Sequence, residues 1–117
     1  MRMHNLSIDG KEIMFMNNYR GTGSGFMHET ELYINGWQAA AARCHYINRT
    51  WERYTYQSVM LEAVHKLQQR ETEREKHIFR QQRGIKNIMG RHKSALEEQL
   101  ENSKELLFYK KIEEALR

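Results

Sequence analysis

The fold of this chain is decided by residues 26–46, which read FMHETELYINGWQAAAARCHY. In the first half of this segment every second residue is expected on one side, and these residues are Phe26, His28, Thr30, Leu32 and Ile34. A period of two residues is typical of a β-strand. Asn35 and Gly36 follow it. This pair is the strongest short-range signal for a two-residue hairpin turn, because both residues accept a positive φ. We therefore expect an antiparallel hairpin in which Trp37 lies opposite Ile34.

Four consecutive alanines, at residues 39–42, come soon after the turn and would suit a helix by intrinsic propensity. The turn before them and the apolar residues after them favour a strand instead. Continuing the ladder from the turn predicts that His28 and His45 share one face of the sheet and that Cys44 points to the other. The pairs expected in this register are Ala39 with Leu32, Ala41 with Thr30, and Arg43 with His28.

A second hairpin is expected near the start of the chain. Asp9 and Gly10 favour the same type of turn, and folding about them places Leu6 opposite Ile13. Residues 17–25 contain three alternating glycines, so we interpret them as a flexible connection between the two hairpins. A phosphate-binding loop is disfavoured there, because a strand pattern rather than a helix follows the glycines.

The rest of the chain is predicted to be helical. Apolar residues recur at helical spacing over residues 56–67, which indicates one face of a helix packed on the sheet. The apolar stripe vanishes over residues 68–76, so we expect a solvated helix there, supported by pairs such as Glu71 with Arg74. A second long helix is predicted beyond Gly84, which is expected to end or bend the first.

The sequence therefore predicts an α+β fold with the order ββββαα, a four-stranded antiparallel meander followed by two long helices. At 117 residues the chain is expected to form a single domain. Within it, residues 1–67 would hold the sheet and the docked first half of the first helix. Residues 68–117 would form either an extended helical arm or a helical hairpin.

Composition narrows the class of protein further. Apolar residues make up 39% of the chain and charged residues 29%, which supports a modest core and differs from the composition of disordered chains. The single cysteine excludes an internal disulfide and a multi-cysteine zinc site. With no apolar run long enough for a signal peptide or a membrane span, we expect a cytoplasmic protein with no membrane association.

No set of residues in the sequence converges on a catalytic or metal site. His28 and His45 would supply two ligands at most, and an arginine near them disfavours a cation. Glu29 and Glu31 are the only acids that share a face of the predicted sheet, whereas metal-dependent nucleases need more convergent carboxylates. Cys44 lacks an activating base, because its strand neighbour His45 points the other way. We therefore expect no enzyme activity, no metal and no cofactor.

Positive charge is concentrated in the middle of the chain. Residues 55–93 hold nine Lys or Arg against four acidic residues, whereas residues 94–117 hold four against six. Such a basic segment can neutralise phosphates or an acidic protein surface, and its binding to nucleic acid would weaken as salt rises. The alternative is a solvated face that the acidic end of the chain complements. The candidate binding residues are Arg74, Lys76, Arg80, Arg83, Lys86, Arg91 and Lys93.

A second candidate surface is the aromatic corner between the predicted sheet and the first helix. Trp, Tyr and Arg are the residue types that most often anchor interfaces, and this short segment contains all three. In the alternative interpretation the aromatic rings close the end of the core, and polar side chains satisfy the backbone at the turn. The residues of this partner-binding corner are Asn48, Arg49, Trp51, Arg53 and Tyr54.

Two segments carry a resemblance to known proteins, SGFMHETELYING at residues 24–36 and CHYINRTWERYTYQSVM at residues 44–60. They resemble small proteins carried by phages, plasmids and conjugative elements of low-GC Gram-positive bacteria, in which a Tyr-x-Asn-Arg-Thr-Trp-Glu-x-Tyr-x-Tyr-Gln-Ser run ends a sheet and opens a helix. The helical tail lies outside this resemblance. Such genetic neighbourhoods are rich in anti-defence proteins. From this genetic setting, the resemblance implies a mobile-element protein of the anti-CRISPR kind.

These observations lead to an expectation for function. The leading hypothesis is a non-enzymatic protein that acts by binding, most concretely an anti-CRISPR inhibitor of a Cas9-type effector or of its loading with guide RNA. The alternative is a stand-alone basic DNA- or RNA-binding module or small regulator. A homodimer formed through the helices is a third arrangement that the sequence permits.

Overall fold

The computed structural model describes residues 2–23, 25–46, 56–83 and 103–117, and it has the predicted α+β fold with ββββαα order. Four antiparallel strands form one sheet, in which each strand lies beside the next one along the chain. The strands are β1 (Arg2–Ile8), β2 (Lys11–Thr22), β3 (Gly25–Ile34) and β4 (Trp37–Tyr46).

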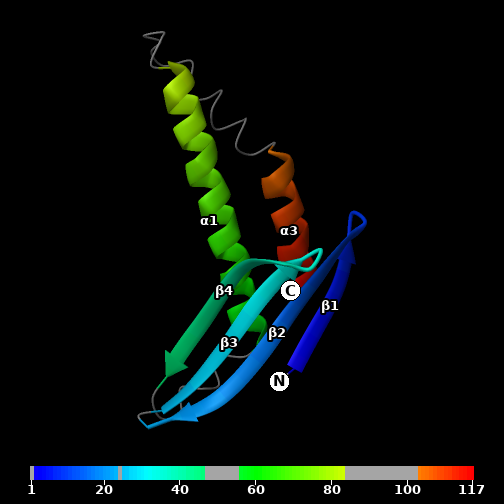
Figure 1. Cartoon of the computed structure of the whole chain (residues 1–117), viewed down its shortest axis with the longest axis vertical. Helices are drawn as coiled ribbons and strands as arrows, with labels where there is room; N and C mark the ends of the chain where they lie inside the picture. The colour runs from blue at the N-terminus through cyan, green and yellow to red at the C-terminus, as the bar shows by residue number, and fades with distance from the viewer. Residues whose placement is uncertain (1, 24, 47–55, 84–102) are drawn as a thin grey trace.

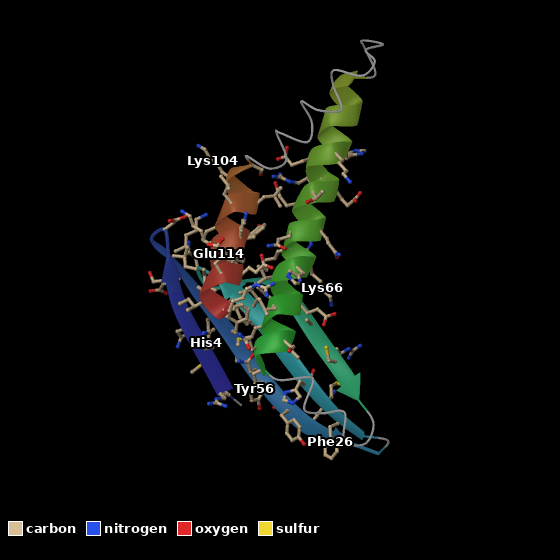
Figure 2. The ribbon with its side chains drawn as sticks, turned by 180° about the vertical axis from the view of Figure 1, so that it is seen from behind. His4, Phe26, Tyr56, Lys66, Lys104 and Glu114 are labelled. Atoms are coloured by element: carbon tan, nitrogen blue, oxygen red, sulfur yellow. The ribbon has the colours of Figure 1, made fainter. Side chains whose placement is uncertain are left out.

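Two described helices follow the sheet, α1 (Tyr56–Arg83) and α3 (Lys104–Leu116). Both lie against the same face of the sheet, behind it in Figure 1 and in front of it in the reverse view of Figure 2. α1 packs against β3 and β4, and α3 packs against α1 and reaches β1. The far half of α1 extends beyond the sheet (Figure 1).

The first hairpin has the predicted turn and register. Asp9 and Gly10 have φ values of 53° and 76°, which are the two positive values that a type I′ turn requires. Leu6 lies opposite Ile13, as expected. Ile13 is 1% exposed, so this side of the hairpin faces the core.

The expectation of a flexible connection over residues 17–25 is wrong. β2 and β3 continue into this segment until Thr22 pairs with Gly25. Asn17 is 2% exposed, and its side-chain oxygen accepts a 2.6 Å hydrogen bond from the hydroxyl of Thr30. The glycines and asparagines of this segment are typical of loops, so its strand alternation was not recognised. The buried polar residue in it, Asn17, is satisfied by its hydrogen bond with Thr30 on the neighbouring strand.

The register of β3 with β4 differs by one residue from the expected one. Trp37 lies opposite Ile34 as predicted, but Leu32 lies opposite Ala40, because Ala39 is an extra residue in β4. A β-bulge of this kind moves every later residue of the strand to the other face of the sheet. The expected pairs were therefore wrong, and the observed partners of Leu32, Thr30 and His28 are Ala40, Ala42 and Cys44.

The bulge turns small side chains toward α1. Ala40 and Ala42 are 5% and 4% exposed, whereas Ala41 is exposed. Small residues at these positions let the helix backbone approach the strand closely, and close packing maximises the dispersion contacts. The apolar core that results comprises Ile13, Phe15, Leu32, Ala40, Ala42, Val59, Met60, Ala63, Val64, Leu67, Phe108, Ile112 and Leu116.

Helix α3 is fastened to both the sheet and α1. Lys111 Nζ lies 2.9 Å from Asp9 Oδ2, which ties α3 to the turn between β1 and β2. His65 Nε2 lies 2.8 Å from Glu113 Oε1, and this contact ties α3 to α1. Hydrogen bonds from His65 and Arg117 lower the pKa of Glu113 to about 2. The described end of the chain therefore packs on the sheet layer and does not project from it.

Lysine substitutions at Ala41 and Ala42, which are neighbours on β4, test whether β4 contains the bulge. Ala42→Lys directs an unpaired ammonium into the core and is expected to lower the free energy of unfolding by about 3–5 kcal/mol. Ala41→Lys lies opposite Glu31 on the exposed side, so the expected change is below about 0.5 kcal/mol. Urea denaturation near neutral pH measures both values. The reverse ranking would mean that β4 pairs without a bulge.

Candidate functional site

The basic segment proposed from the sequence lies only partly within the described residues. Arg74 and Lys76 lie in the second half of α1, and Arg80 and Arg83 lie in its last turns. Lys76 is half-buried. Three further candidates lie outside the described residues, and they are Lys86, Arg91 and Lys93.

Arg74 is engaged within the fold. Its Nη2 lies 2.7 Å from Glu71 Oε1, so the pair expected from the sequence is confirmed, and this hydrogen bond raises the pKa of the guanidinium. Glu71 is 7% exposed, which corrects the expectation that residues 68–76 are fully solvated. On α3, burial and then the charge of Glu105 raise the pKa of the Tyr109 phenol. This side of α1 therefore belongs to the packing of α1 on α3.

Two other cations of α1 bind the edge of the sheet. Lys66 Nζ donates a 3.1 Å hydrogen bond to the carbonyl of Ala41, and Arg70 Nη1 donates a 3.0 Å bond to that of Ala39. β4 is an edge strand, so these carbonyls have no strand partner. The sequence did not reveal this role, because it depends on which backbone groups the bulge at Ala39 turns outward.

The predicted partner-binding corner lies outside the described residues, since Asn48, Arg49, Trp51, Arg53 and Tyr54 all fall within 47–55. The structure does describe the end of the sheet where β4 ends and α1 begins, and an aromatic cluster lies there. Phe26 and Tyr56 are labelled at this end in Figure 2. Three contacts define the cluster, each between two of the rings of Tyr19, Phe26, His28 and Tyr56.

The cluster is buried at one side and exposed at the other. The rings of Tyr19 and Phe26 stack with centroids 5.9 Å apart, and they are 45% and 37% exposed. His28 is 8% exposed, its ring lies edge-on to Tyr56 at 4.9 Å, and burial lowers its pKa. The guanidinium of Arg2 lies 5.7 Å from the centre of the Tyr56 ring. Sequence reasoning missed Tyr19 because its strand was interpreted as a loop, and the alternation around it was the available signal.

The opposite face of the sheet carries no described helix and is rich in methionine. Figures 1 and 2 show both helices on the other side of the sheet. Among the described residues, four methionines lie on this open face, where Met3 pairs with Met16 and Met14 pairs with Tyr33. We call this surface the methionine face, and its members are Met3, Met14, Met16, Met27 and Tyr33.

A hollow of about 530 Å³ opens on the methionine face near the edge strand β1. Its lining includes Asn5 and Ser7 of β1, Glu12 and Met14 of β2, and Tyr33 of β3. It is shallow and joins apolar and polar groups, which suits the insertion of one side chain from another protein more than the enclosure of a small molecule.

Cys44 faces the helix and is poorly suited to nucleophilic chemistry. It lies opposite His28 on the same face, and His45 lies opposite Met27, so the faces expected for these residues were wrong. The Cys44 thiol donates a 3.1 Å hydrogen bond to Glu62 Oε2, and burial together with this bond raises its pKa to about 11. Such a thiol stays protonated near neutral pH and is a weak nucleophile.

Among the described residues, no group of three or more His, Cys, Asp or Glu side chains is placed to hold a metal ion. None of the described helices is long and apolar enough to cross a membrane. No family model, curated protein or solved structure matches this chain. The case for a function therefore rests on the surfaces described above.

The half-buried Cys44 thiol leads to a prediction about reactivity. At about pH 8, Cys44 is expected to react with iodoacetamide about 100-fold more slowly than a free cysteine, because only a small fraction is thiolate. Glu62→Gln removes the neighbouring negative charge and should lower the pKa and speed the reaction, whereas Glu73→Gln, on the same helix, should not. Alkylation rates from about pH 7 to 11, followed by mass spectrometry, give the pKa. A rate equal to that of free cysteine would contradict the contact between Cys44 and Glu62.

Proposed function

We propose that this protein is a non-enzymatic inhibitor or adaptor that acts by binding a protein effector in the cytoplasm of a bacterial host. Its most concrete form is an anti-CRISPR protein that engages a Cas9-type effector or blocks its loading with guide RNA. The effector and the host follow from the resemblance of residues 24–36 and 44–60 to mobile-element proteins. The mode of action, binding through a surface, is supported by the methionine face.

The composition of the methionine face supports a protein partner. Methionine is flexible and polarisable, so it adapts to the shape of a bound surface, and Met and Tyr are enriched at protein interfaces. A four-stranded sheet with strands of about ten residues offers a face of roughly 19 × 33 Å, about 600 Å². A standard interface buries about 800 Å² on each partner, so this face is large enough to form its centre.

The distribution of charge on this face supports the same mode of binding. Arg20 Nε lies 3.0 Å from Glu29 Oε1 at one end of the face, and Glu12 lies near the other end. The hydroxyl of Tyr33 donates to Glu31, and this bond raises the pKa of the phenol. Glu31 lies opposite Met16, so methionines and satisfied polar groups alternate across this face. Protein interfaces combine apolar contacts with hydrogen-bonded polar groups in this way.

A nucleic-acid-binding module remains the second candidate because of the aromatic cluster. Exposed aromatic rings stack on unpaired bases, and Tyr19 and Phe26 present such rings. Arg2 supplies a cation at the same end of the sheet. This candidate predicts binding to a labelled single-stranded RNA that weakens about 10-fold or more from about 50 to 200 mM salt, and that Tyr19→Ala reduces. Fluorescence anisotropy measures it, and binding that salt leaves unchanged would oppose it.

The leading proposal is tested by charge on the methionine face. The double variant Met16→Glu with Met27→Glu replaces two methionines of this face by carboxylates, one of them opposite Glu31, and is expected to weaken binding to the effector at least about 100-fold. Co-elution of purified effector with the protein, and DNA cleavage by that effector, are the measurements. Inhibition of cleavage should fall together with binding.

Two matched variants control for charge and for folding. Lys110→Glu changes an exposed residue of α3, and Lys76→Glu changes one of the basic candidates on α1. Both are expected to keep binding within about 3-fold of the original. Circular dichroism spectra confirm that each variant folds. Absence of both co-elution and inhibition in the unaltered protein would reject the proposal, and loss only in Lys76→Glu would transfer the contact to α1.

A further inference from the structure

The two edges of the sheet differ in how their free backbone groups are satisfied. On β4, side chains from α1 hydrogen-bond the outward carbonyls of Ala39 and Ala41. An exposed strand edge is a template for pairing with another chain, and covering it in this way prevents such pairing. The part of the β4 edge around Ala39 and Ala41 is therefore closed to strand addition.

The β1 edge has its own free backbone groups, and the turn geometry identifies them. Ile8 and Lys11 flank a two-residue turn, so they form a hydrogen-bonded pair, and such pairs alternate along an antiparallel ladder. Glu12 confirms the alternation, because its N–H and its carbonyl both engage Asn35 on the other side of β2. The outward N–H and C=O groups of β1 therefore belong to Met3, Asn5 and Ser7.

Nothing among the described residues covers these groups. Met3, Asn5 and Ser7 are all exposed, and no described backbone hydrogen bond from another element reaches them. β1 has seven residues, no proline and no bulge, and its only charged residue is Arg2 at its first position. Proline, bulges and central charges are the usual protections of an edge strand, so β1 is open to strand addition.

We propose that β1 pairs antiparallel with β1 of a second copy of this chain, about a twofold axis at Asn5, so that one continuous sheet runs through both copies. The outward groups are self-complementary in this register, because residues 3, 5 and 7 of one strand meet residues 7, 5 and 3 of the other. Each of these pairs exchanges two hydrogen bonds, about six in all.

The hollow on the methionine face favours a second copy over other partners. In this register Met3 of each copy lies opposite Ser7 of the other, on the same face, where Ser7 and Asn5 form the border of the hollow. Met3 is 60% exposed in the single chain. In the proposed dimer, the exposed Met3 side chain of each copy therefore lies beside the hollow of the other copy. It buries apolar surface that strand pairing alone would leave in water.

Charge complementarity supports the same register. Arg2 of one copy lies opposite Ile8 of the other and therefore next to Asp9 in the turn that follows. The Asp9 side chain is 49% exposed and lies beside Lys111, so it keeps room for a second cation. A parallel pairing would instead place the two Arg2 side chains side by side. The antiparallel register brings opposite charges together at both ends of the interface.

A register-specific cross-link tests this dimer. In a Cys44→Ser background, Asn5→Cys places two thiols on directly opposed residues with Cα atoms about 5.5 Å apart, a distance that a disulfide spans. Ser7→Cys places their Cα atoms about 14 Å apart, too far for a disulfide. Mild oxidation of the full chain should give at least about 10-fold more disulfide-linked dimer for Asn5→Cys. Equal yields from the two variants would overturn the proposed register.

Sedimentation equilibrium supplies the second test. The unaltered chain is expected to dimerise with a Kd of about 1–100 μM, as suits a small interface. Asn5→Pro removes an outward N–H that β1 does not use within the chain, and it should weaken the dimer at least about 10-fold, whereas Asn5→Ala should not. Met3→Lys should weaken it similarly, whereas Met27→Lys, on the same face but away from β1, should not.

Two results would overturn the dimer through β1. One is a monomer at every concentration up to about 200 μM, well above the Kd expected for such an interface. The other is a dimer that Asn5→Pro and Met3→Lys leave intact, which would place the contact elsewhere, such as in the helices. Circular dichroism confirms folding of each variant. Neither result bears on the proposed effector, because Met16→Glu and Met27→Glu test that contact separately.

Discussion

The extra residue at Ala39 is the constraint on which the rest of the structure depends. Without it, Ala39, Ala41 and Arg43 would face α1, and a guanidinium would have to lie beneath the helix at high desolvation cost. With it, two small alanines face the helix instead, and the Cys44 thiol meets Glu62. A single inserted residue thus decides how closely α1 lies on the sheet.

This arrangement divides the sheet into used and open surfaces. α1 and α3 occupy one face, and two cations of α1 cover the β4 edge at Ala39 and Ala41, so this face and this part of the edge are not available to a partner. The methionine face and the β1 edge stay open among the described residues. They differ in kind, since one offers adaptable side chains and the other offers unpaired backbone groups. The proposed dimer uses the β1 edge and the hollow beside it, whereas the proposed effector contact is tested at Met16 and Met27, and the two share the border of the methionine face at Met3.

Much of the fold was predictable from local signals, and the surfaces were not. The turns at Asp9 and Asn35 and the helical period over residues 56–67 each appear in a few neighbouring residues. The bulge does not, because a run of alanines reads the same in either register and only packing against α1 selects one. The methionine face was missed for a different reason, since residues 17–25 were interpreted as a loop and the pairing of β2 with β3 was therefore not expected.

The central claim, that the bulge places Ala40 and Ala42 beneath α1, is tested most directly by nuclear Overhauser effects from alanine methyl groups. A sample labelled at alanine, valine and leucine methyls distinguishes the two faces of β4, because such effects are seen only at short range. The structure predicts contacts from the methyls of Ala40 and Ala42 to the buried apolar residues of α1, and none from that of Ala41. Contacts from Ala41 to α1, with none from Ala40 and Ala42, would contradict it.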